Sequence, residues 1–215
     1  PAQSPVFTKA GVYTNDFALK KARGISGVVQ LADGTPVTNA TVVLVEPSDE
    51  ASMEKPGELR RNGSSGDFQR TNARGQFEFA PKLMPHTILA SHALGFAEVR
   101  ASNVIASGKV ILQPWGRITG KVRVGKGSQQ ERTVSVQSED WQHGMEGRTG
   151  PPLSLFMKAE TDADGNFTVE RVPPGDRKAN MQVKVNDRSS GRGAASTHGM
   201  PVTVKPGATT DVLIG

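Results

Sequence analysis

Apolar and polar residues alternate along much of this chain with a period of two. Gly27, Val29 and Leu31 fall on one side of an early run, and Phe77 and Phe79 share a side further along. Such alternation is typical of antiparallel strands with one buried face and one wet face. No stretch of useful length has a helical period. The pattern therefore predicts an all-β fold.

Short alternating runs are separated by turn residues about every ten positions, which is typical of a β-sandwich. Asp33-Gly34 is a strong hairpin signal, since glycine takes positive φ at little cost. We expect six or seven strands in each half of the chain. The expected strands cover 25–31, 40–45, 76–80, 87–91, 96–100 and 109–113, then 117–124, 132–137, 166–170, 180–185, 201–205 and 210–214.

Two landmarks recur in the same order. Ile25-Ser26-Gly27-Val28-Val29 returns about ninety residues later as Ile118-Thr119-Gly120-Lys121-Val122, and the string 72–77 returns as 162–167. Recurrence at nearly constant spacing indicates two copies of one unit in tandem. The glycines shared by the landmarks are then expected to be structural: Gly27, Gly75, Gly120 and Gly165.

The repeat sets the expected boundaries. A first sandwich covers 23–113 and a second covers 114–215, while 1–22 is the tail of a preceding unit or an added edge strand. Only Pro114 and Trp115 separate the two copies, which predicts a stiff joint with Trp115 packed between them.

These strings resemble the carboxypeptidase regulatory-like domain. The resemblance rests on 25–29, 33–37, 40–42 and 75–77 in the first copy, and on 118–120, 161–167 and 172–175 in the second. It implies two tandem seven-stranded Greek-key sandwiches of the transthyretin-like (prealbumin-like) kind. It also implies non-catalytic accessory modules of a larger exported bacterial protein of the planctomycete type, extracellular or periplasmic. The second copy departs from the family at its first turn, where Gly125-Lys126-Gly127 stands.

Two polar stretches rich in Gly, Ser and Pro, 46–70 and 138–152, occupy equivalent positions and are expected to be long loops. The second contains Trp141, flanked by Asp140 and close to His143. An aromatic ring can stack on a sugar while a carboxylate takes hydroxyl groups, so these three residues are the candidate ligand-binding set. The alternative is a loop whose tryptophan folds back on the sandwich.

Composition excludes several classes. The net charge of +5 comes from dispersed basic residues, and aromatic residues make up only 5% of the chain, so no nucleic-acid partner is expected. The absence of cysteine excludes disulfides and thiolate metal sites. No window of 18 apolar residues is present, so no membrane insertion is expected.

The remaining motifs favour no catalytic residue, metal or cofactor. Asp162-Ala163-Asp164-Gly165 opens like a calcium loop, but Pro173 stands where the twelfth-position Glu should be, so a β-turn is the better interpretation. The four histidines lack zinc-site spacing, and the nucleophile-elbow and phosphate-loop motifs are missing.

Three functions remain open. The favoured one is a structural spacer or presentation module whose partners are neighbouring domains of the same longer chain. The second is a carbohydrate- or peptide-binding module that uses the two long loops. The third is an accessory domain of an enzyme whose catalytic part lies elsewhere.

Overall fold

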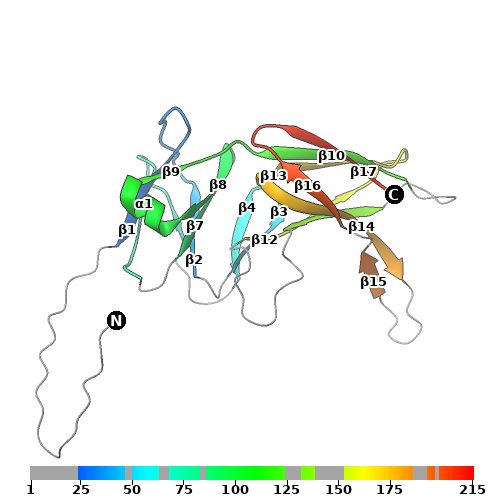
Figure 1. Ribbon diagram of the computed structural model, residues 1–215. Coiled ribbons are helices and arrows are strands. Elements are labelled where there is room, and N and C mark those ends of the chain that lie inside the picture. Colours follow the sequence, from blue (N-terminus) through cyan, green and yellow to red (C-terminus); the bar gives the residue numbers. More distant parts are fainter. Residues whose placement is uncertain are drawn as a thin grey trace, which may run out of the picture.

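The computed structural model describes residues 24–46, 50–62, 68–82, 86–123, 132–138, 153–185, 193–196 and 199–215. These residues are mostly strand, so the predicted all-β sandwich fold is confirmed (Figure 1). One short helix that the sequence did not predict, α1 (Ala101–Ser107), ends at Gly108 in the left-handed conformation, φ 69°. No helix in the described part is long and apolar enough to cross a membrane. The segment 1–22 lies outside the described residues.

The N-terminal sandwich packs a three-stranded sheet on a four-stranded one, as far as the described residues show. The first sheet has the order β6 (Gln76–Phe79), β1 (Ile25–Gln30), β9 (Lys109–Ile111); the second has β5 (Phe68–Arg70), β2 (Thr41–Val45), β7 (Thr87–His92), β8 (Gly95–Arg100). Alternate side chains of both sheets meet in one core. Its largest members include Val29, Phe77, Phe79, Val42, Leu44 and Ile88.

The C-terminal sandwich repeats this pairing. Its first sheet has the order β13 (Asn166–Val172), β10 (Gly116–Val122), β17 (Thr209–Ile214). As β1 pairs antiparallel with β6 and parallel with β9, so β10 pairs antiparallel with β13 and parallel with β17. The facing sheet contains β11 (Thr133–Ser138), β12 (Leu153–Glu160), β14 (Gly175–Val185), β15 (Gly193–Ser196) and β16 (Met200–Val204).

The repeated turn has the predicted form in both sandwiches. The Asp162 carboxylate accepts hydrogen bonds from the backbone N–H groups of Asp164 (3.0 Å) and Asn166 (2.8 Å), while Gly165 has φ 82°. The pKa of Asp162 is lowered most by a further hydrogen bond from the Asn166 side-chain amide (3.0 Å), and also by these backbone bonds. Asn72 plays the same part in the first copy, accepting from Gln76 N at 3.0 Å. The interpretation as a side-chain-bonded turn is confirmed.

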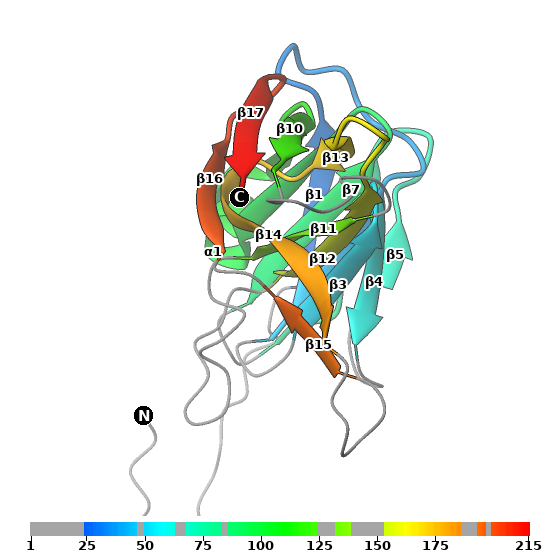
Figure 2. The same ribbon diagram turned by 90° about the vertical axis from the view of Figure 1, so that its right-hand side faces the viewer.

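The predicted long loop over 46–70 is wrong. Residues within it form a hairpin, β3 (Glu50–Lys55) and β4 (Glu58–Asn62), followed by β5. β3 pairs in parallel with β12, placing Ala51 beside Leu153 and Met53 beside Leu155. Figure 2 shows β3 and β4 continuing the succession β14, β11, β12. A hairpin from the N-terminal half therefore completes a sheet of the C-terminal half.

The physical reason lies in alternate apolar side chains that the polar composition conceals. Ala51 and Met53 are fully buried, and Leu59 is 5% exposed. They join the C-terminal core, which also takes Val43 and Leu89 from the N-terminal four-stranded sheet. Burying Met53 and Leu59 contributes roughly 3 to 6 kcal/mol before opposing entropy.

The two central strands of the N-terminal four-stranded sheet, β2 and β7, are consequently buried on both faces. Val42 and Leu44 point into their own core, whereas Val43 and Val45 point into the core shared with the C-terminal half. The expectation of one wet face per sheet is wrong here. A run of consecutive apolar residues is what such two-sided burial requires.

Candidate functional site

The candidate ligand-binding residues Trp141, Asp140 and His143 lie outside the described residues, as does all of the predicted loop 138–152 except Ser138, which ends β11. Their role stays a prediction. Within the described residues, no group of three or more His, Asp or Glu side chains could hold a metal ion. The described features of functional interest are the junction between the two halves and a groove beside it.

Trp115 lies at this junction, half-buried against the shared core. Its indole Nε1 donates to the backbone oxygen of His92 at 2.9 Å, and its ring centroid is 5.7 Å from that of Phe96. The neighbouring Pro114 oxygen accepts from Gly207 N at 3.3 Å. The joint between β9 and β10 is thus bonded to β7 of the first sandwich and to the turn between β16 and β17 of the second.

The tip of the β3–β4 hairpin is fastened at the same place. Gly57, with φ 76°, turns the chain, and its oxygen accepts a hydrogen bond from Ser91 Oγ at 2.7 Å. A Cβ at Gly57 would lie 3.7 Å from Trp115 Cζ2, so tip and indole are in close proximity. Hairpin, joint and β7 therefore meet in one contact region.

One charge from each half also influences the other's pKa. Burial raises the pKa of Glu98 in β8, and the positive charge of Arg177 in β14 partly opposes that rise. Burial likewise lowers the pKa of Arg177. The Arg177 guanidinium donates to the oxygens of Pro173 (3.2 Å) and Pro174 (2.7 Å), which holds the turn before β14 in place.

The repeated glycines permit close approaches between strands. A Cβ on Gly27 would lie 3.0 Å from Val104 Cγ1 and 3.1 Å from the Phe77 ring. The approach is closer in the second copy, where a Cβ on Gly120 would lie 2.3 Å from the backbone oxygen of Val212. A side chain at Gly120 cannot be accommodated without moving a strand, whereas one at Gly27 requires the Val104 and Phe77 side chains to shift.

A groove of about 770 Å³ opens where the hairpin crosses the margin of the N-terminal four-stranded sheet. The hairpin tip and β4 form one side, β5 and the start of β2 form another, and the β7–β8 turn closes an end. The lining residues are Asn39, Thr41, Pro56, Gly57, Glu58, Leu59, Arg60, Phe68, Arg70, Ser91, His92 and Ala93.

The groove combines an apolar ring with an excess of positive charge. Phe68 on β5 is 49% exposed, which is unusual for a large aromatic side chain. Arg60 pairs with Glu58 at 3.1 Å. Arg70 Nη1 instead donates to the neutral Asn39 Oδ1 at 3.2 Å, so within the described lining its charge is not balanced by a carboxylate.

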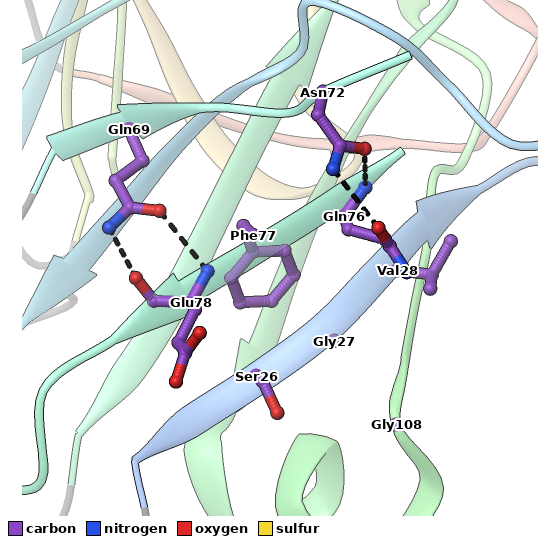
Figure 3. A pocket seen from close by; sticks show the side chains of 9 residues that line it. All are labelled: Ser26, Gly27, Val28, Gln69, Asn72, Gln76, Phe77, Glu78 and Gly108. Atoms are coloured by element: carbon purple, nitrogen blue, oxygen red, sulfur yellow. Dashed lines mark hydrogen bonds between the residues drawn. The ribbon is translucent and has the colours of Figure 1, made fainter. Parts of the chain in front are cut away.

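A second hollow of about 520 Å³ lies over β1 and β6 (Figure 3). Its polar side chains are already engaged. The Gln69 amide donates to the Glu78 oxygen and accepts from Glu78 N at 3.1 Å, so it pairs with the edge of β6. The Asn72 amide is bonded to Gln76. These groups complete the sheet edge, and the hollow offers few free polar groups to a ligand.

No protein-family model and no curated protein sequence matches this chain. Among solved structures, it is similar to GBS52, the minor pilin of Streptococcus agalactiae, at 12% identity and a TM-score of 0.40, over 90% of this chain and 94% of that one. It is also similar to a streptococcal ancillary pilin, at 13% identity and a TM-score of 0.37, over 90% of this chain and 62% of that one. A putative carbohydrate-binding protein from Pseudomonas aeruginosa is similar at 17% identity and a TM-score of 0.30, over 47% of this chain and 88% of that one.

At these identities and TM-scores, the likenesses support no statement about this chain's function or partners. The carboxypeptidase regulatory-like family is matched by no family model. Membership of that family therefore stays a proposal.

Sequence reasoning missed both the hairpin and the groove. One available signal was the continuous apolar run Val42-Val43-Leu44-Val45, because a strand with a wet face does not need apolar residues at every position. The equivalent strand β11 alternates, with Val134 and Val136 buried in the core. The exposure of Phe68 had no signal in the sequence, because it depends on where the hairpin tip ends.

Proposed function

We propose that this chain is a non-catalytic structural module that holds two sandwiches, residues 23–113 and 114–215, at a fixed relative orientation. The observation that carries the proposal is the pairing of β3 with β12, since it makes one sheet out of strands from both halves. A connection through main-chain hydrogen bonds and a shared core resists bending far better than a two-residue joint alone.

The contact region at Trp115 supports the same role. The indole bond from Trp115 to His92 connects the two halves, and the Ser91–Gly57 bond fastens the tip of the hairpin that pairs with β12. Inter-domain interfaces without such connections allow relative motion by default. The module's task is spacing and presentation within a longer exported protein, and its partners are the neighbouring domains of that protein.

Nitrogen-15 relaxation of the whole chain tests the proposal. Amides of β1 and β6 should report the same overall tumbling time and rotational axes as amides of β10 and β13, because the two sandwiches turn as one body. Two separate tumbling times would refute it. A control variant with Ser91 changed to Ala removes only the bond to the hairpin tip and should leave a single tumbling time, because the shared sheet remains.

A further inference from the structure

We infer that the groove between the hairpin tip and β5 is a binding site for an acidic saccharide. The inference concerns the described lining of that groove and is independent of the structural role proposed above. It also differs from the predicted site at Trp141, which lies in another segment of the chain.

The first argument is the pairing of an exposed ring with an unbalanced cation on one strand. Phe68 and Arg70 are two residues apart on β5, so their side chains emerge from the same face. Their partners on β2 are Val43 and Thr41. An apolar ring beside a guanidinium matches a sugar ring that carries a carboxylate, because the ring face packs on the aromatic side chain and the guanidinium takes two oxygens.

The second argument is that the cation is held in position. Arg70 is oriented by the 3.2 Å bond to Asn39, which is a neutral acceptor and leaves further donors of the guanidinium for a ligand. Asn39 itself has φ 58°, in the left-handed region, and its N–H donates to the oxygen of Thr71 at 3.0 Å. The local backbone therefore fixes the acceptor that orients Arg70.

Charge and volume agree with an anionic ligand of modest size. The described lining contains two arginines and one glutamate, so positive charge is in excess. The volume of about 770 Å³ is within the range of small-ligand sites. It is large enough for a short oligosaccharide.

An acidic peptide that binds by adding a strand fits less well, because that mode needs a free strand edge. β5 has only the three residues Phe68–Arg70, which supply few main-chain hydrogen bonds. β4 presents the ion pair of Glu58 and Arg60 beside the groove, and charged side chains on an edge strand disfavour pairing with another strand. The groove offers side-chain groups rather than a free edge, which favours a saccharide.

The test uses the full chain and a tetrasaccharide of alternating uronic acid and hexosamine, with a neutral hexosamine tetrasaccharide of equal length as its counterpart. Binding is followed by chemical-shift titration of backbone amides. We expect shifts confined to β5, the hairpin tip and the β7–β8 turn, and affinity for the acidic sugar at least tenfold above that for the neutral one.

Arg70→Gln and Phe68→Ala should each weaken binding about tenfold. Two matched controls should change it less than twofold: Arg74→Gln, which removes an equal charge from an exposed turn, and Leu213→Ala, which removes a side chain of similar exposure (48%) from β17. If Phe68→Ala fails to fold, Phe68→Leu retains apolar volume and removes only the ring.

The inference would be overturned if the acidic sugar caused no shift at high concentration, or if the neutral sugar bound with equal affinity. An equal loss of binding on Arg74→Gln would also overturn it and would indicate diffuse attraction to a basic protein. Tighter binding of an acidic peptide than of the acidic sugar would overturn it as well and would indicate a peptide site.

Discussion

Truncation of Met53 should destabilise the whole chain, although this residue belongs to a segment that composition assigns to a loop. Its side chain is fully buried in the core shared by both halves. Met53→Ala removes three heavy atoms, worth roughly 2 kcal/mol at about 0.8 kcal/mol per methylene-sized group, and the cavity left behind adds to this. We expect a loss of about 2 to 4 kcal/mol in the free energy of unfolding.

Urea unfolding followed by tryptophan fluorescence measures the loss. A Trp141→Phe background leaves Trp115, at the junction, as the reporter, since the chain has two tryptophans. With a slope of about 2 kcal/mol per molar urea, the midpoint should fall by roughly 1 to 2 M. The control Glu54→Ala changes the next, exposed residue and should cost less than about 0.5 kcal/mol.

A midpoint for Met53→Ala that matches the Glu54→Ala control would refute the reasoning. Hydrogen exchange gives a second readout, because amides of β12 beside β3 should exchange faster in Met53→Ala. If only amides of the N-terminal sandwich responded, the hairpin would not be part of the C-terminal sheet.

Three further predictions follow from single positions. Gly120→Ala should lower stability by about 2 kcal/mol or more in thermal melts, because its Cβ would lie 2.3 Å from the Val212 oxygen; an unchanged melting temperature would contradict the strand spacing. Because the pKa of Asp162 is lowered in the folded state, its contribution is complete above the ordinary Asp pKa and is lost as pH falls through the lowered value. Asp162→Asn, which copies Asn72, should therefore flatten the acid limb of a stability–pH curve, and an equally steep limb would count against the bonded turn. Val43→Ser should cost about 2 to 3 kcal/mol in chemical denaturation, since it places an unpaired hydroxyl in the shared core; a neutral effect would mean that this face is not buried.

The positions of most strands were predictable because their side chains alternate and turn residues separate them. The landmark repeated around Gly27 and Gly120 indicated that the strands containing them occupy equivalent positions in the two halves. The strands predicted from the sequence did not include β12, which covers residues 153–160. Leu153, Leu155 and Met157 alternate with mostly polar positions and are buried, so the strand carried a period-two signal that the prediction overlooked.

Pro56-Gly57 is a local turn signal for the hairpin itself. Its pairing with β12 could not be predicted, because that partner is about a hundred residues away and the pairing is parallel. The registers of the equivalent strand pairs β2–β7 and β11–β14 show how the outer faces of the two sandwiches differ. Val43 pairs with Leu89 on the outer face of the first sandwich, whereas the equivalent pair in the second is Ser135 with Asn180. Apolar residues occupy these positions in the half that the hairpin covers, and hydrogen-bonded polar residues occupy them in the other.

The pairing of β3 with β12 is tested most directly by a disulfide across it. Ser52 and Ser154 are direct partners in the parallel register, at a separation that suits a disulfide, and the chain has no cysteine of its own. Ser52→Cys with Ser154→Cys should oxidise in air and lose both free thiols, while Ser52→Cys with Lys158→Cys, further along the same face of β12, should keep them. Free thiols in the variant with Ser52→Cys and Ser154→Cys would contradict the shared sheet. Equal oxidation of the two double-cysteine variants would contradict it as well.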